Sequence, residues 1–231
     1  MSCLLIPVTI IIIAFDCGVF TIKRIVCEAT NQEVDYDQQH MEYLREKIII
    51  SIMRNQLDLE VTMDSKKFME QLADGRTPDD ESINSFVVLI RTRDSQLCNQ
   101  NKIKRSHFYR TFFVDNLVHL GFPTKSSSPY TKTTRNAHKW CEELFCHNKV
   151  FVPIHIVNSR FILAVILIPE KRIVIYDMFH CKTTANKYRT ILLCYLNKEF
   201  VDKHSRNLHK DWSVHATQQE QTTPTYAADG T

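Results

Sequence analysis

Glycine is scarce in this chain, and no apolar run is long enough for a membrane span. Only 4 of the 231 residues are glycine, so few backbone positions can take a positive φ without strain. The apolar stretch at residues 3–15 is too short to cross a bilayer, and no basic segment precedes it. A signal peptide is therefore the weaker interpretation. We expect a buried β-strand here, because β-branched residues dominate the stretch.

A strong excess of charge is absent as well. A net charge of +3 is too mild to indicate a nucleic-acid partner. The eight cysteines do not cluster into a disulfide framework, so we expect reduced thiols and a location in the nucleus or cytoplasm. The remaining composition is that of an ordinary globular protein, and the chain is long enough to bury a sizeable core.

Periodicity and turn signals predict a mixture of helices and strands. The clearest strand signals lie at 150–157, 161–168 and 172–176, with a turn at 169–171 between the last two and a short strand near 212–214. Apolar residues at helical spacing predict helices at 17–31, 37–57, 66–72, from 78 to about 91, at 108–120, near 139–145 and at 185–200. The polar residues 92–105 and 123–134 are expected to be loops.

Cys17 is the first candidate for chemistry. It follows Asp16, a good N-cap residue, and we expect it to open the helix over 17–31. A thiol at a helix N-terminus meets the positive end of the helix dipole, which lowers its pKa and favours the thiolate. Taken alone, a cysteine in this place is more often a small core residue.

Two neighbouring motifs give Cys17 more weight. The stretch Asp16-Cys17-Gly18-Val19-Phe20 is followed by Asp37-Gln38-Gln39-His40-Met41 at the start of the next helix. These motifs, in this order, resemble the C-terminal third of the SUMO-specific (ubiquitin-like-protein) cysteine protease family.

The downstream part of the chain resembles the N-terminal two thirds of the same family. The matching segments are Asp80–Phe86, Thr111-Phe112-Phe113, Lys139-Trp140, Val152–His155 and Ile173–Asp177. The resemblance implies an α+β, papain-like cysteine protease fold, with a small mixed sheet packed among helices. Relative to the family the segments stand in circularly permuted order, and we expect residues 1–60 and 61–231 together to form one domain.

Two origins could produce this order. One is a true circular permutant, in which the C-terminus lies beside Cys17. The other is a window cut from a tandem array or a misassembled gene. Both origins are suggested by Gly230, which stands at the family's cysteine spacing from Asp177. We favour the second, because residues 1–15 resemble nothing expected there.

The resemblance assigns roles to individual residues. Cys17 matches the nucleophile and Asp177 the carboxylate that orients the base. Arg160 stands where the family has its catalytic histidine, at the family's interval from Asp177. A guanidinium is always charged, so it cannot take the thiol proton and return it. Phe161 replaces the tryptophan that lines the family's narrow tail channel, and Asp80 belongs to the surface that docks the modifier.

Substitutes for the missing groups are few. His155 is a candidate replacement base, but five residues along an extended strand correspond to roughly 16 Å. His180 is another. The family's oxyanion glutamine has no counterpart just before Cys17, and Gln219 is the candidate donor if the family order is restored. Loss of such a donor costs about 10²–10³ in rate.

Nothing in the sequence indicates a metal or cofactor. Cys141, Cys146 and His147 lie close together, but no second pair has zinc spacing, so we expect no metal and no other cofactor.

The resemblance therefore predicts a cysteine peptidase that hydrolyses the bond after a C-terminal Gly-Gly, impaired by Arg160. The alternative is an inactive pseudo-protease that binds a ubiquitin-like modifier, and a poorly folding remnant is a third option. The expected partners are SUMO or another ubiquitin-like modifier and its conjugates, with neither nucleic acid nor membrane. Exchange of halves between two chains would allow self-association.

Overall fold

A computed structural model describes residues 8–31, 40–53, 63–101, 106–119, 144–156, 160–177, 179, 181–204, 208 and 212–216. Its helices are α1 (Val8–Thr30), α2 (Met41–Met53), α3 (Met63–Ala73), α4 (Asp80–Asn101), α5 (Phe112–His119), the short 3₁₀ helix η2 (Leu144–Cys146) and α7 (Lys182–His204). Its strands are β1 (His107–Phe108), β2 (Lys149–Ile156), β3 (Arg160–Leu167), β4 (Arg172–Tyr176) and β5 (Ser213–Ala216).

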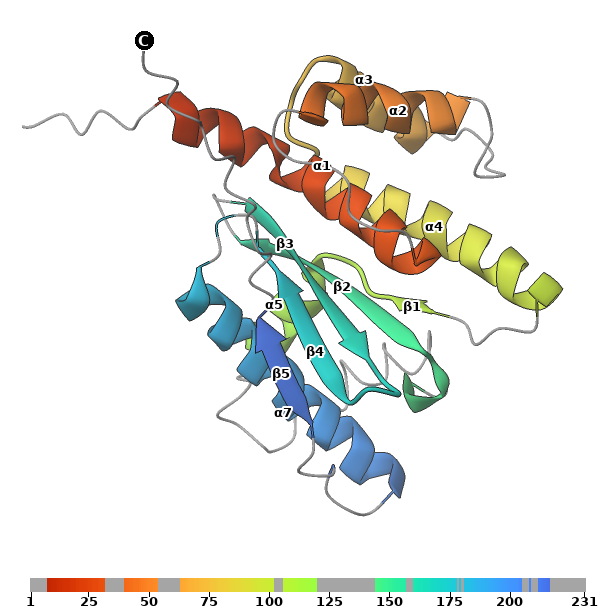
Figure 1. Cartoon of the computed structure of the whole chain (residues 1–231), viewed down its shortest axis with the longest axis vertical. Coiled ribbons are helices and arrows are strands. Elements are labelled where there is room, and N and C mark those ends of the chain that lie inside the picture. Colours follow the sequence, from red (N-terminus) through yellow and green to blue (C-terminus); the bar gives the residue numbers. More distant parts are fainter. Residues whose placement is uncertain are drawn as a thin grey trace, which may run out of the picture.

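The strands form one mixed sheet in the order β1-β2-β3-β4-β5 (Figure 1). The central strands β2, β3 and β4 pair antiparallel, whereas the edge strands β1 and β5 pair parallel to β2 and β4. The three strands with the strongest sequence signal are therefore confirmed, and so is the short strand near residue 213. The mixed α+β architecture agrees with the expected fold class.

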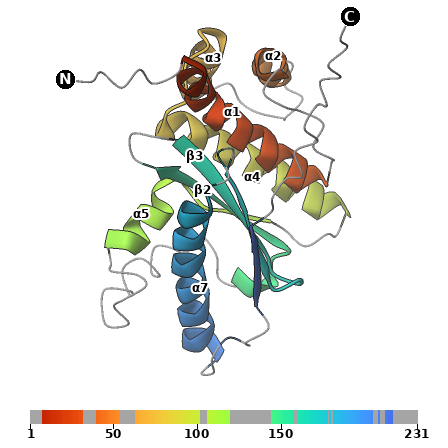
Figure 2. The same ribbon diagram turned by 60° about the vertical axis from the view of Figure 1, so that its left-hand side comes forward.

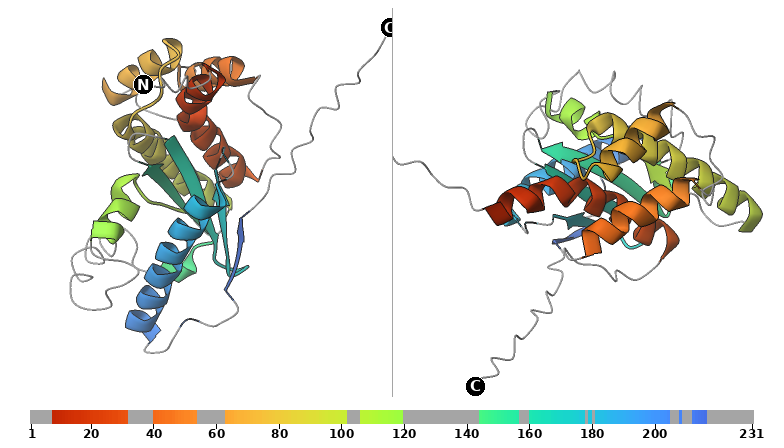
Figure 3. Two further views of the ribbon diagram at one scale, coloured as in Figure 1. Left: turned by 90° about the vertical axis from the view of Figure 1, so that its left-hand side faces the viewer. Right: turned by 90° about the horizontal axis from the view of Figure 1, so that it is seen from above.

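Helices cover both faces of this sheet. α1 and α4 lie on one face, with α2 and α3 outside them, and α5 and α7 lie on the other (Figures 2 and 3). β3 serves both layers, because successive side chains of a strand point to opposite faces. Phe161, Leu163 and Val165 belong to the core under α1, while Ile162 and Ala164 belong to the core under α7.

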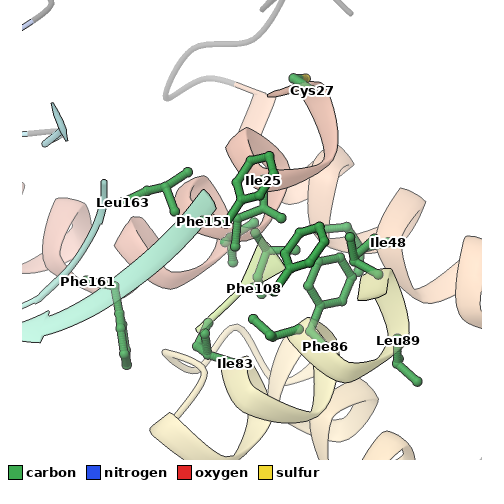
Figure 4. Close-up of a cluster of buried hydrophobic side chains, with 14 of the residues drawn as sticks. Ile25, Cys27, Ile48, Ile83, Phe86, Leu89, Phe108, Phe151, Phe161 and Leu163 are labelled. Carbon is green, nitrogen blue, oxygen red and sulfur yellow. The ribbon is translucent and has the colours of Figure 1, made fainter. Parts of the chain in front are cut away.

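Aromatic rings fill much of the core beneath α1. Phe108 of β1 stacks on Phe151 of β2 with ring centroids 4.7 Å apart, and Phe86 of α4 packs in the same cluster (Figure 4). Ile25 of α1 points into this cluster and is fully buried. α1 is therefore an integral part of the core.

A partly buried carboxylate also fastens α1 to the sheet. Glu28 Oε1 accepts hydrogen bonds from the Tyr176 hydroxyl at 2.6 Å and from Arg24 at 2.8 Å. The Lys149 ammonium donates to the Glu28 carbonyl at 2.6 Å and lies 3.3 Å from Oε2. Burial alone would raise the pKa of Glu28, but the Tyr176 hydroxyl and the charges of Arg24 and Lys149 lower it below its usual value. The carboxylate therefore stays ionised and links α1, β2 and β4.

The prediction of a strand over residues 3–15 is wrong for residues 8–15, which are helical in α1. A continuous apolar run does not distinguish a buried strand from a helix, and β-branched composition tipped the prediction the wrong way. Residues 3–7 lie outside the described part of the chain.

Two further boundaries differ from expectation. Residues 92–101, predicted as part of a loop, continue α4, and no glycine or proline interrupts them. After the helix, the Ser106 backbone N–H donates to the Asp94 carboxylate at 2.8 Å. The helix predicted from residue 108 begins only at Phe112, because His107 and Phe108 pair as β1 with the edge of β2. In the described part of the chain, no helix is long and apolar enough to cross a membrane.

The buried His107 predicts a pH dependence of stability. Burial, with the nearby charges of His147 and Arg91, lowers the pKa of His107 from 6.5 to about 3. The fold thus accommodates the neutral ring and disfavours the charged one. The stability of the folded state that depends on a neutral His107 is complete above pH 6.5 and is lost as the pH falls towards 3. The free energy of unfolding should drop by up to about 2 kcal/mol between pH 6.5 and 5 from this group. Urea unfolding should show a shallower dependence for His107→Phe, whereas the exposed His119→Ala should leave the slope unchanged. Equal slopes for His107→Phe and wild type would contradict this.

The close approach of α1 to the turn before α4 gives a second prediction. A Cβ placed on Gly18 would lie 2.9 Å from Pro78 Cδ, which is too close for carbon atoms. Gly18→Ala should therefore reduce the free energy of unfolding by about 1–3 kcal/mol. The loss should be smaller in a Pro78→Ala background, where the clashing carbon is absent. Additive losses in a double-mutant cycle would show that the two residues do not meet.

Candidate functional site

Cys17 lies within α1 and is fully buried. Its Sγ accepts a hydrogen bond from the backbone N–H of Phe161, at 3.2 Å, where β3 begins. The structure therefore places the predicted nucleophile directly beside the predicted base position, Arg160.

The expectation that Cys17 opens its helix is wrong. α1 begins at Val8, so Cys17 stands in the helix interior and does not face the positive end of the helix dipole. Burial raises the pKa of the thiol above its usual value, and the Phe161 N–H and the Arg160 charge offset this only in part. The thiol is thus protonated at neutral pH, and a thiol reacts far more slowly than a thiolate.

Arg160 and Asp177 form a two-point ion pair. Arg160 Nε and Nη2 donate to the two Asp177 carboxylate oxygens at 3.0 and 2.9 Å. Burial works against the charged guanidinium, but the bonds and charge of Asp177 outweigh it and raise the pKa of Arg160. The carboxylate that would orient an imidazole is therefore engaged by a group that cannot accept a proton.

Asp177 also shapes the turn that leads into α7. Its Oδ1 accepts a hydrogen bond from the Phe179 N–H at 3.0 Å, and its Oδ2 accepts one from the Cys181 N–H at 3.3 Å. The Arg160 guanidinium lies over the Phe179 ring, 4.8 Å from its centroid. Asp177 thus has a structural role that does not depend on catalysis.

Cys181, a residue that the sequence reasoning missed, lies at this turn. The thiol accepts a hydrogen bond from the Thr184 hydroxyl at 3.2 Å, and the Cys181 carbonyl accepts the first bond of α7 from Ala185 N–H. The Thr184 bond, with a smaller contribution from the charge of Arg160, lowers the pKa of Cys181. A cysteine three residues before a threonine at a helix start was the signal that could have revealed it.

His155 of β2, Phe161 of β3 and Asp80 at the start of α4 lie together. His155 Nδ1 is 2.6 Å from Asp80 Oδ2, and the imidazole stacks on the Phe161 ring with centroids 4.4 Å apart. His155 pairs with Phe161 across β2 and β3, so the two side chains share the sheet face that α1 covers. The described contacts of His155 are with Asp80 and Phe161, and its role as a substitute base stays a prediction.

Two other candidates, Gln219 and His180, lie outside the described residues. β5 ends at Ala216, which pairs with Ile175, two residues before Asp177. The oxyanion role of Gln219 stays a prediction. Of the three residues that suggested a metal site, Cys141 also lies outside the described residues, and among those described no group of three His, Cys, Asp or Glu side chains could hold a metal ion.

Comparison with known proteins identifies the family. Residues 79–226 match the model of the Ulp1 protease family, C-terminal catalytic domain, which is more than half of the chain. This chain belongs to the Ulp1 protease family.

Relatives and solved structures agree with this assignment. Over 141 residues the chain is 30% identical to Ubiquitin-like-specific protease 1A of Arabidopsis thaliana, a match that covers 59% of this chain and 26% of that protein. The match thus spans about a quarter of the relative's length. The fold resembles that of the SUMO protease Ulp1 with its catalytic cysteine oxidised to a sulfenic acid, with a TM-score of 0.51 and 20% identity over 79% of this chain and 74% of that one. A sulfinic-acid form gives a TM-score of 0.50 at 19% identity, covering 80% and 74%.

The resemblance to the protease family inferred from the sequence is therefore confirmed, and so is the fold. The permuted order stays a prediction, as do the division at residue 60 and the roles of the individual site residues. The family match begins at residue 79, so Cys17 lies outside it.

The two thiols should differ in reactivity. Cys181 is partly exposed with a lowered pKa, whereas Cys17 is buried with a raised one. Because the thiolate is the nucleophile, iodoacetamide should alkylate Cys181 well before Cys17 in the native protein at a pH of about 7.5. Peptide mapping by mass spectrometry over time measures both rates, and Thr184→Val should slow only Cys181. Earlier labelling of Cys17 would contradict the assignment.

Proposed function

We propose that this chain is a Ulp1-family module that binds SUMO or another ubiquitin-like modifier without hydrolysing its conjugates. The observation that carries this proposal is the Arg160–Asp177 ion pair beside Cys17. Cysteine proteolysis needs a group that takes the thiol proton and later gives it to the leaving amine. At this position the chain offers a guanidinium, which performs neither transfer.

The state of Cys17 points the same way. The thiol is buried, its pKa is raised, and it lies in the interior of a helix. General acid–base catalysis contributes about 10²–10⁴ in rate, so loss of the base alone would leave little turnover. Burial of the nucleophile removes more.

Binding of a modifier rests on the family and on two residues at positions that the resemblance assigns to binding. Relatives in this family are described as a ubiquitin-like-specific protease and as a SUMO protease. Asp80 stands partly exposed at the start of α4 and Phe161 follows Arg160, at the positions that the resemblance assigns to docking and to the tail channel. A nuclear or cytoplasmic location belongs to the same proposal.

The alternative is a slow peptidase acting after a Gly-Gly tail. The specific observation in its favour is that Cys17, Arg160 and Asp177 adjoin one another, although they come from segments far apart in the sequence. Such an arrangement fits a family site assembled in permuted order, with residues 1–60 supplying the nucleophile and residues 61–231 the rest. Opening of the site on binding would then expose the thiol.

An electrophilic trap distinguishes the two. Purified protein is incubated with SUMO that carries a thiol-reactive group at its C-terminus, and the intact mass is recorded. We expect no Cys17-dependent adduct, because the thiol is buried and has no base, while calorimetry with mature SUMO detects binding.

Cys17→Ala controls for labelling at the other cysteines, and circular dichroism shows that each variant is folded. A Cys17-dependent adduct on the wild-type chain would overturn the proposal and support the peptidase. An adduct restricted to Arg160→His would assign the loss of activity to the missing imidazole.

A further inference from the structure

One side chain links two parts of the surface near Cys17. His155 contacts the Asp80 carboxylate through Nδ1 at 2.6 Å, and its ring stacks on Phe161 with a 16° angle between the planes. The same imidazole therefore contacts the partly exposed Asp80 carboxylate and stacks on the Phe161 ring.

The burial of the three residues shows which of them is hidden. Phe161 is only 3% exposed, whereas the His155 and Asp80 side chains are 31% and 47% exposed. The backbone N–H of Phe161 holds the Cys17 thiol, so the hidden ring is next to the site. The imidazole and its carboxylate form the accessible layer over it.

The charged side chains next to Asp80 in the sequence pair elsewhere, whereas Asp80 contacts His155. The Lys67 ammonium pairs with Asp79 at 3.2 Å and with Glu81 at 2.5 Å. Among the described residues, the side chain that contacts the Asp80 carboxylate is His155. A basic group on a binding partner would thus compete with the imidazole for this carboxylate. A contact between two partly exposed side chains contributes little to stability, so this exchange requires little energy.

We propose that His155 is a latch that couples docking at Asp80 to uncovering of Phe161. When a basic side chain of the modifier takes Asp80, the imidazole loses its partner and swings off the Phe161 ring. An extended C-terminal tail then packs on the exposed ring. This inference rests on the proposed function, and it adds that Asp80 and Phe161 bind cooperatively through one side chain.

The latch makes a prediction about two forms of the modifier. Calorimetry compares mature SUMO with SUMO lacking its Gly-Gly tail, on the wild-type chain, His155→Ala and the exposed control His119→Ala. A closed latch lowers the apparent affinity by the fraction of open molecules. His155→Ala should therefore bind tailed SUMO about threefold or more tightly than wild type does, with a smaller gain for tail-less SUMO. His119→Ala should match wild type. Equal gains for the two forms, or no gain, would overturn the latch.

A second readout needs no modifier. Phe161→Trp places a fluorescent ring under His155, and Trp140 and Trp212 give a background that is subtracted using the parent chain. Acrylamide should quench the introduced indole only weakly, and quenching should increase when His155→Ala is added. Unchanged quenching would overturn the latch.

The two readouts separate this inference from the proposed function. If no form of SUMO binds any variant but quenching rises as expected, the proposed function fails and the covering of Phe161 stands. If SUMO binds and both latch tests are negative, the proposed function stands and the latch fails.

Discussion

The partly buried Glu28 carboxylate is the interaction on which the attachment of α1 to the sheet depends. It links α1 to β4 through the Tyr176 hydroxyl and to β2 through the Lys149 ammonium, which lies 3.3 Å from its Oε2. The Arg24 guanidinium lies over the Tyr176 ring, 3.6 Å from its centroid. Burial and the bond to Glu28 raise the pKa of Tyr176 to about 12, so its hydroxyl remains a donor at any physiological pH. Because Glu28 is only 18% exposed, removing one partner from this network should cost more than losing a fully exposed surface pair. The network fixes both the position and the rotation of α1, and the contact between Cys17 and Phe161 follows from them.

The Asp177 carboxylate combines a structural role with an ion pair to Arg160. Asp177 still makes the bonds that shape the turn into α7, and Arg160 satisfies both of its carboxylate oxygens. The Arg160 guanidinium thus keeps a buried acid paired, but it cannot accept a proton. Retention of Asp177 is accordingly explained by the structure of the turn, and it does not imply proteolysis. A module of this kind would keep the binding surface of a protease and lose its turnover.

The sequence predicted the parts of the fold whose signals are local and strong. β2, β3 and β4 have β-branched runs with a clear turn between the last two, and α7 has apolar residues at helical spacing, so all four were located closely. The motifs around Cys17 and Asp177 led to the correct family, although no local rule required the two segments to meet.

The misses have physical causes. The helix over Val8–Phe15 was missed because a continuous apolar run carries no period that separates strand from helix. Cys17 consequently lies inside a helix and not at its start. β1 exists only because the edge of β2 accepts it, which is a tertiary effect with no local signal. The pairing of Arg160 with Asp177 was not foreseen, since sequence spacing alone does not show that a guanidinium can reach both oxygens of a carboxylate. Cys181 was overlooked because the family comparison drew attention to Cys17.

Hydrogen exchange of the native chain tests the central claim most directly, namely that α1 is part of the protease core and holds Cys17 against β3. If α1 is locked in place by Glu28, the amides of residues 19–30 should exchange only through global unfolding, with protection equal to that of β3. Fast exchange in α1 while β2, β3 and β4 remain protected would show that the helix is not fixed to the sheet. The arrangement of Cys17, Arg160 and Asp177 described here would then be wrong.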